Sequence, residues 1–183
     1  KTMIPKLDII PTSPDLSVLE QELVNEQNRE FKLRNLIEDI NNIYDYIFID
    51  CPPSLGLLTL NSLCAAKGLI IPLQTEFYAL EGLSQLLNTI AAVRTQFNSG
   101  LDIQGVVLTM FDRRNNLALA VAADVRDHLG DKVYQTVIPR NVRVSEAPSH
   151  GRPVLLYDMN CSGAQAYIHL ASEVLKRERR VAA

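Results

Sequence analysis

Long apolar runs, a leading apolar segment and closely spaced cysteines are all missing from this sequence, and each absence excludes a class of protein. The apolar run from Leu69 to Leu73 is interrupted by Pro72, and no apolar run approaches the roughly 20 residues that cross a bilayer. The first five residues, Lys1 to Pro5, have no apolar stretch behind the charge, so they do not match a secretory signal. We therefore expect a cytoplasmic protein without contact to a membrane.

The three cysteines, Cys51, Cys64 and Cys161, are scattered along the chain. Their spacing matches no metal site, and an odd number does not indicate a disulfide framework. This usage suits a reducing compartment. With 47% hydrophobic and 21% charged residues, the composition is that of a folded globular domain.

Two glycine patterns that open many nucleotide-binding α/β folds are absent as well. Neither G-x-x-x-x-G-K-[ST] nor G-x-G-x-x-G occurs in the 183 residues. Such a loop supplies the row of backbone N–H groups that cradles phosphates. We interpret the chain as beginning inside a fold rather than at its edge.

Charge, in contrast, is plentiful and unevenly distributed. Residues 1–109 hold 7 Lys and Arg against 13 Asp and Glu, whereas residues 110–183 hold 11 against 8. One interpretation is scatter over a solvated surface. The other is a basic face in the C-terminal half that meets a polyanion.

Apolar runs rich in β-branched residues alternate with stretches of helical periodicity. Such alternation predicts right-handed crossovers and a parallel sheet. We expect one α/β domain over residues 1–183: a mainly parallel sheet with helices on both faces, similar to P-loop NTPases but without the N-terminal part. The expected strands span residues 7–10, 46–50, 68–73, 103–109 and 133–138, and the expected helices 16–41 (one or two), 58–66, 80–97, 117–129 and 163–179.

Asp50 ends the apolar run Tyr46–Asp50, which is typical of a buried parallel strand. In nucleotide hydrolases a carboxylate at this position, the Walker B aspartate, holds Mg²⁺ directly or through water. A strand-terminal aspartate can also simply cap the next helix, and these five residues alone leave both interpretations open. The loop that follows is stiff, because Pro52 and Pro53 fix φ before Gly56 frees the backbone. Such a loop favours a segment that repositions against a γ-phosphate, as switch loops do.

The stretch DYIFIDCPPSLGLLTLN, residues 45–61, closely resembles the Walker B and switch II region of the ParA/Soj family of DNA-partitioning ATPases. Four further blocks resemble the family in order and spacing, so that the resemblance runs over essentially the whole chain. They are FYALEGL at 77–83, GVVLTMFD at 105–112, IPRNVRVSEAPSHG at 138–151 and GAQAY at 163–167.

The resemblance implies roles for particular residues. Asp50 is the catalytic and Mg²⁺-binding carboxylate, and the loop of Pro52, Pro53 and Gly56 is switch II. Met110, Pro139 and Asn141 border the adenine base of ATP. A proline carbonyl beside a backbone N–H can bind an adenine edge, and methionine offers a soft apolar face. The alternative for these last three residues is an ordinary strand-to-loop connection.

Arg114 and Arg143 fall where Soj-like proteins place arginines that bind DNA without sequence preference. Each follows an expected strand, so both leave the carboxyl edge of the predicted sheet. A guanidinium group suits phosphate because its donors form a fork and its charge is permanent. The alternative is that they are exposed loop arginines without a role.

The family's deviant Walker A loop and its acidic switch I segment are both absent from the chain. Three explanations are open: a fragment, a sequence that omits an N-terminal piece, or a degenerate relative that has lost catalysis. Retention of Asp50 and its loop favours the first two.

As a function, the resemblance implies ATP-dependent segregation of a chromosome or plasmid. ATP and Mg²⁺ would be bound between two subunits, and the homodimer would hold non-specific DNA and associate with the nucleoid. A ParB-like centromere-binding protein would stimulate hydrolysis. A non-catalytic relative that binds DNA or a partner is one alternative. A MinD-like membrane-site regulator is another, against which the tail Lys176–Arg180 argues because it has no Phe, Trp or Leu to insert.

Overall fold

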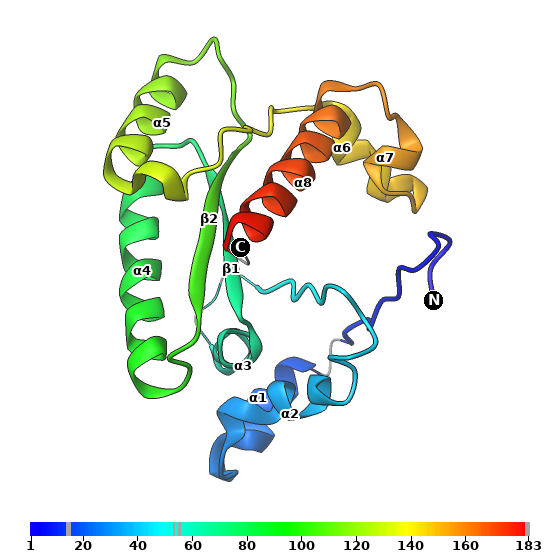
Figure 1. Ribbon diagram of the computed structural model, residues 1–183, viewed down its shortest axis with the longest axis vertical. Helices are drawn as coiled ribbons and strands as arrows, with labels where there is room; N and C mark the ends of the chain where they lie inside the picture. Colours follow the sequence, from blue (N-terminus) through cyan, green and yellow to red (C-terminus); the bar gives the residue numbers. More distant parts are fainter. Residues whose placement is uncertain (14–15, 53, 55, 182–183) are drawn as a thin grey trace. The chain divides into compact units, whose positions relative to one another are not determined.

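The structure is a computed structural model that describes residues 1–13, 16–52, 54 and 56–181. These residues form two compact units. The first comprises Lys1–Ala66 with Val93–Ser99, and the second Lys67–Ala92 with Gly100–Ala183. Figure 1 labels the elements of both units.

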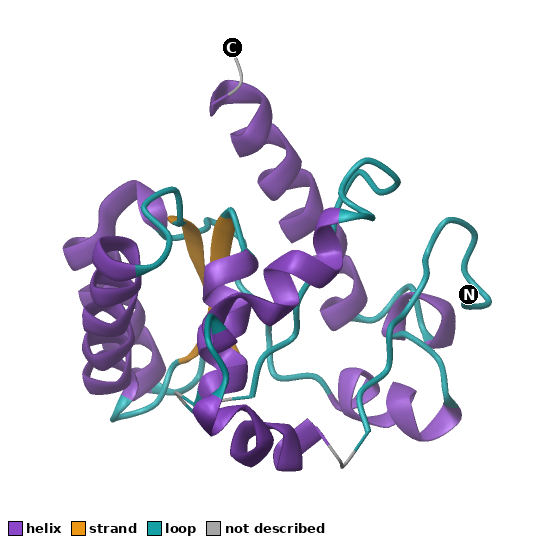
Figure 2. Cartoon of the chain, turned by 90° about the horizontal axis from the view of Figure 1, so that it is seen from below, coloured by secondary structure: helices purple, strands orange, loops and turns teal. Residues whose placement is uncertain are grey.

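The second unit is an α/β layer around two parallel strands, β1 (Gly68–Gln74) and β2 (Asp102–Thr109). Helix α4 (Ala79–Gln96), whose last turn groups with the first unit, connects the two strands. Helices α4 and α5 (Asn116–Leu129) lie on one side of the strands, and α8 (Ser162–Val181) lies on the other (Figure 1). The strands thus lie between layers of helices (Figure 2), which confirms the predicted α/β class and its parallel pairing.

Residues 133–139 run beside β2: Val133 is bridged to Val106, Pro139 is bridged to Phe111 just beyond the strand, and the N–H groups of Tyr134 and Ile138 donate to β2 carbonyls at 2.9 and 2.8 Å. Between these bridges, the N–H groups of Gln135 and Thr136 donate at 2.8 and 2.9 Å to the carboxylate of Glu173 in α8. The carboxylate of Glu173 has therefore replaced a neighbouring strand as the acceptor for these two amides. The prediction of a continuous strand over 133–138 is wrong for this reason.

Helix α8 packs on residues 133–139 through one apolar face. Its Ala166, Leu170 and Val174 contact a cluster of buried side chains that includes Tyr134, which is 1% exposed. The rest of the cluster is Val107 and Ile138, with Ile70 packed against it. Apolar residues at i, i+4 and i+8 lie along one stripe of a helix, so the sequence periodicity accounts for this packing.

The first unit consists of helices and irregular segments. Its helices are α1 (Leu16–Glu22), η1 (Leu23–Asn25), η2 (Arg29–Phe31), α2 (Lys32–Glu38) and α3 (Leu57–Ala65). Asn61 of α3 joins them: its amide accepts from the N–H of Leu33 at 3.1 Å and donates to the carbonyl of Arg29 at 2.9 Å. The helical region expected over 16–41 is confirmed, in several short pieces.

The strands predicted at residues 7–10 and 46–50 are wrong: neither segment has regular secondary structure. Phe48 is 81% exposed and stacks on Tyr46 with 6.2 Å between ring centroids. A parallel strand needs a hydrogen-bonded neighbour and cover on both faces. The described part of the first unit contains no strand with which 46–50 could pair, so Asp50 does not lie at the end of a buried central strand.

The other predicted elements are confirmed within two residues at each end, namely β1, β2, α3, α4, α5 and α8. Short helical turns complete the second unit: η3 (Gly130–Lys132), α6 (Val142–Glu146), η4 (Ala147–His150) and α7 (Val154–Tyr157). Among the residues described here, no helix is long and apolar enough to cross a membrane.

Candidate functional site

The carboxyl end of β2 brings together the two segments predicted to border a base. Met110 follows the strand directly, and the next residue, Phe111, forms a parallel bridge with Pro139. The N–H of Phe111 donates to the carbonyl of Ile138 at 3.1 Å, and the N–H of Arg140 donates to the carbonyl of Phe111 at 3.2 Å. Met110 and Pro139 therefore lie on adjacent loops at one edge of the strands.

Met110 adopts a left-handed backbone conformation with φ of 51°. Few residues other than glycine adopt this conformation, since the Cβ crowds the following carbonyl. The side chain is 37% exposed. Backbone strain of this kind, held directly after a strand, is typical of binding and switch sites.

Both polar atoms of the Asn141 side chain form hydrogen bonds to other residues of the protein. Its Oδ1 accepts from the N–H of Arg143 at 2.9 Å as the N-cap of α6, and its Nδ2 donates to the hydroxyl of Ser162 at 2.9 Å. Gly163 allows this approach, since an added Cβ would meet Val144 and would lie 3.2 Å from the Cβ of Asn141. Asn141 thus joins the starts of α6 and α8, and its contact with a nucleotide stays a prediction.

Arg114 lies in the loop that leaves β2, and its guanidinium forks onto Asp112. Nε and an Nη donate to the two carboxylate oxygens at 3.0 and 2.8 Å, and the backbone N–H adds a bond of 3.0 Å. These side-chain and backbone hydrogen bonds lower the pKa of Asp112 to about 2. The Arg114 side chain is nevertheless 89% exposed, so it has donors to offer to solvent or to a ligand.

Arg143 lies in the first turn of α6, which follows the Pro139 segment. Its guanidinium donates to Glu146 at 2.9 Å and lies 3.6 Å from Asp158. The hydrogen bond to Glu146 raises the pKa of Arg143. The side chain is 54% exposed. Arg114 therefore follows the carboxyl end of β2, and Arg143 follows the neighbouring segment 133–139. Both arginines are paired with carboxylates.

The loop after Asp50 belongs to the first unit, and Asp50 itself is exposed. Pro52 is described, whereas Pro53 lies outside the described residues. The buried hydroxyl of Thr59 donates to the carbonyl of Ser54 and, at 3.5 Å, to that of Pro52. The first turn of α3 therefore contacts this loop at Pro52 and Ser54.

Asp50 can serve Mg²⁺ as one ligand. The described residues contain no cluster of three or more His, Cys, Asp or Glu side chains that could hold a metal ion. Mg²⁺ keeps several waters and needs only one or two carboxylates when substrate phosphates complete its shell. A single exposed carboxylate is therefore compatible with a metal that arrives with a nucleotide.

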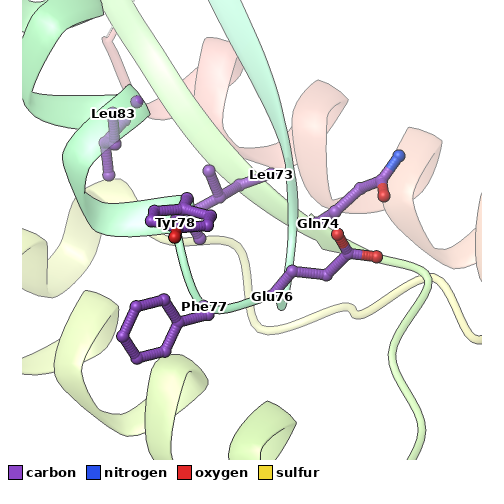
Figure 3. Close-up of a pocket in the computed structure, with 8 residues that line it drawn as sticks. Leu73, Gln74, Glu76, Phe77, Tyr78 and Leu83 are labelled. Carbon is purple, nitrogen blue, oxygen red and sulfur yellow. The ribbon is translucent and has the colours of Figure 1, made fainter.

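A shallow cavity of about 360 Å³ opens at the carboxyl end of β1. Phe77 and Tyr78 form one wall; they are 72% and 73% exposed and meet edge to face, with 5.1 Å between ring centroids. In Figure 3, Gln74 and Glu76 lie opposite these rings. The remaining lining residues are Leu73, Ala79, Gly82 and Leu83.

The carboxylates that pair with the two arginines were missed in the sequence. The i, i+3 spacing of Arg143 and Glu146 is a signal that could have found one pair. Thr59 and Glu20, which hold the loop after Asp50 and the start of α3, were also missed. Glu20 is 38 residues from its partner Leu58, so no local pattern indicates that contact.

Comparisons with known proteins agree with these features. A family model described as an AAA domain matches residues 1–103. The chain is 59% identical over 181 residues to the chromosome partitioning protein ParA of Caulobacter vibrioides, covering 98% of this chain and 68% of that protein. It is 54% identical over 173 residues to the sporulation initiation inhibitor protein Soj of Bacillus subtilis, covering 94% and 68%.

Solved structures share the fold. A cobyrinic acid a,c-diamide synthase from Mycobacterium smegmatis with bound ADP and magnesium is 33% identical to the chain, with a TM-score of 0.77 over 92% of this chain and 62% of that one. The Pyrococcus furiosus cell division ATPase MinD is 25% identical, with a TM-score of 0.65 over 80% of this chain and 58% of that one.

Proposed function

This chain belongs to the ParA/Soj family of chromosome-partitioning ATPases, and we propose that it provides the base- and DNA-binding part of an ATP-dependent DNA-segregation protein. The observation that carries the proposal is the bridge between Phe111 and Pro139. It joins two loops at one edge of the strands, one leading to Arg114 and the other to Arg143. A nucleotide and a polyanion could both be bound from this edge.

In this proposal, Met110, Pro139 and Asn141 border the adenine, and Asp50 holds Mg²⁺ directly or through water. Mg²⁺ would neutralise charge on the phosphates of bound ATP. The glycine-rich loop that cradles phosphates does not occur in the 183 residues. Hydrolysis is therefore proposed for a chain in which these residues follow such a loop.

Arg114 and Arg143 bind DNA phosphates without reading sequence. Each would exchange a carboxylate partner for a phosphate, or offer it the donors that the carboxylate leaves free. An ATP-bound homodimer would present the pair twice and align four guanidinium groups along a duplex. We propose that a ParB-like centromere-binding protein stimulates hydrolysis and that the dimer associates with the nucleoid.

A second candidate is a non-catalytic module that binds DNA or a partner without turnover. The two candidates differ in their dependence on ATP. We would measure binding to two unrelated duplexes by fluorescence anisotropy, with and without ATP and Mg²⁺, for residues 1–183 alone and behind a glycine-rich loop. ATP-dependent binding by the longer chain, with dimerisation detected by light scattering, supports the ATPase. ATP-independent binding by both chains supports the module.

A further inference from the structure

One carboxylate of α1 reaches the start of α3. Oε1 of Glu20 accepts a hydrogen bond from the N–H of Leu58 at 3.1 Å. Gly56, the N-cap residue of α3, has φ of −78°, which any residue can adopt. A Cβ added there would nevertheless lie 2.6 Å from Oε1 of Glu20. Glycine is therefore needed at position 56 for close approach, so that the carboxylate can reach the helix.

This contact replaces an ordinary helix cap. The first N–H groups of a helix have no partner within it and usually receive one from the N-cap side chain. Gly56 has no side chain, and Glu20 supplies the acceptor from another helix. A negative charge is also favoured at this end of the helix dipole.

The same end of α3 is the end of the loop that begins after Asp50. Only residues 51–56 separate Asp50 from Leu57, the first residue of α3. Thr59 holds the loop's carbonyls from within the helix, and Glu20 holds the helix entrance from outside. Two side chains from different elements therefore hold Pro52, Ser54 and the start of α3.

We propose that Glu20 is a positioning residue for the start of α3: its carboxylate contacts Leu58 and lies against Gly56, and so fixes the point at which the chain after Asp50 enters the helix. Glu20 acts through Leu58 and Gly56 rather than on the nucleotide or the metal. The role deepens the proposed ATPase function and rests on it, because the position of the loop affects a reaction rate only if Asp50 serves a bound nucleotide.

The contact itself can be tested on residues 1–183 without ATP. In Glu20→Ala, the amide of Leu58 should exchange hydrogen roughly tenfold faster or more, the change expected when a bond to a charged acceptor is removed. The amide of Cys64, near the other end of α3, should change little. Glu20→Gln keeps an acceptor oxygen and should restore most of the protection. Glu22→Ala, an exposed position on the same helix, is the matched control. Equal Leu58 exchange in wild type and Glu20→Ala would overturn the contact.

The positioning role is tested in the longer chain that carries a glycine-rich loop. Glu20→Ala should lower kcat by about tenfold with little change in KM, because misplaced groups slow the reaction more than binding. The control is Asn98→Ala, which destabilises α3 from its other end. Asn98 donates to the carbonyls of Leu63 and Ala66 at 2.9 and 2.8 Å, so its removal weakens the helix without changing a contact of the loop. An equal loss of kcat in Asn98→Ala, at a matched loss of Tm, would overturn the positioning role.

A double mutant separates the two residues further. Gly56→Ala should displace the carboxylate of Glu20 from α3, so Gly56→Ala and Gly56→Ala/Glu20→Ala should have the same kcat. Additive losses would contradict the proposal. If the wild-type longer chain hydrolysed no ATP, the proposed function would fall and the positioning role with it. The exchange of Leu58 would still report whether the contact exists.

Discussion

The guanidinium carbon of Arg177 lies 4.1 Å from the centre of the Tyr134 ring. The same guanidinium donates to the carbonyls of Asp131 and Val133, each at 2.9 Å, and to Glu173 at 3.0 Å. Arg177 therefore holds the end of α8 against the segment that replaces a third strand. Tyr134 is buried, so the cation–π contact is shielded from water on the ring side.

Arg177→Ala should lower the free energy of unfolding by about 2 kcal/mol, since it removes a cation–π contact and several charge-assisted hydrogen bonds. Arg177→Lys should retain part of this stability, because an ammonium cannot form the same fork of bonds. Urea denaturation measures both. Arg179→Ala, an exposed residue two positions further along α8, is the control. Equal stability of Arg177→Ala and Arg179→Ala would contradict the anchoring role.

The carboxylate of Glu173 makes stability depend on pH. Burial raises the pKa of this glutamate, but the hydrogen bonds from the N–H groups of Thr136 and Gln135 outweigh burial and lower the pKa overall. The folded protein therefore binds fewer protons here than the unfolded chain does. The stabilisation is present above about pH 4.3, the ordinary value for glutamate, and is lost as the pH falls through the lower folded pKa.

Glu173→Gln should accordingly be less stable than wild type at neutral pH and should lose less stability on acidification. Gln135 and Thr136 donate to different oxygens of Glu173, and glutamine replaces one of these oxygens with an NH₂ donor, so one amide loses its acceptor and the other loses a charged one. Denaturation curves at pH 7 and at about pH 3.5 measure the difference between the two proteins. A constant difference across this range would exclude Glu173 as a source of the pH dependence.

These contacts show why the sequence predicted some strands and not others. The buried runs of β1 and β2 pair with each other, and their apolar pattern was sufficient to predict both. The run at 46–50 is equally apolar, but a pattern along the chain does not say whether a neighbouring strand is present. The segment at 133–138 was misassigned because Glu173, 38 residues beyond Gln135, accepts from the amides of Gln135 and Thr136 in the middle of the segment.

The candidate site was predictable to a similar extent. The resemblance selected Met110, Pro139, Arg114 and Arg143, and the structure brings their loops to one edge. The ion pairs of the two arginines depend on side-chain directions within turns, which sequence spacing does not fix. The left-handed backbone of Met110 was equally hidden, since methionine gives no signal for that conformation.

The strain at Met110 can be measured by comparing two substitutions. At ordinary helical positions alanine is more stable than glycine, but at a left-handed position the order reverses. Met110→Gly should therefore be more stable than Met110→Ala by about 1 kcal/mol. The same pair at Ser172, an exposed position inside α8, should show the usual order. If alanine were the more stable residue at both positions, Met110 would not be strained.

For the ATPase, we expect no measurable hydrolysis by residues 1–183 alone, because no glycine-rich loop is present to cradle the phosphates. In the longer chain that carries such a loop, Asp50→Ala should abolish hydrolysis, since Mg²⁺ would lose its protein ligand. A phosphate-release assay on freshly purified protein measures both. Turnover by the 183-residue chain that disappeared in Asp50→Ala would reveal a phosphate site elsewhere in these residues.

Arg114 and Arg143 are the proposed DNA-binding residues, and their removal should weaken binding in a characteristic way. In an ATP-bound dimer of the longer chain, Arg114→Ala and Arg143→Ala should each weaken binding about equally on unrelated DNA sequences. Phosphate contacts carry affinity but no base information, so a uniform loss is expected. Each substitution should also reduce the slope of log affinity against log salt by roughly one for each phosphate that the guanidinium no longer neutralises. ATP hydrolysis without DNA should change little, because neither arginine is assigned to the metal or the phosphates.

Asp112 provides the matched test of this surface, because its carboxylate holds the guanidinium of Arg114 in a fork of two hydrogen bonds. Asp112→Asn removes the competing charge, so it should strengthen DNA binding in the wild-type background. In Arg114→Ala it should have a smaller effect, since the guanidinium that it releases is absent. Unchanged DNA affinity in both arginine variants at moderate salt would exclude Arg114 and Arg143, and the basic tail Lys176–Arg180 would become the next surface to test. An equal gain from Asp112→Asn with and without Arg114 would instead indicate general repulsion by Asp112, acting on the DNA directly rather than through its partner.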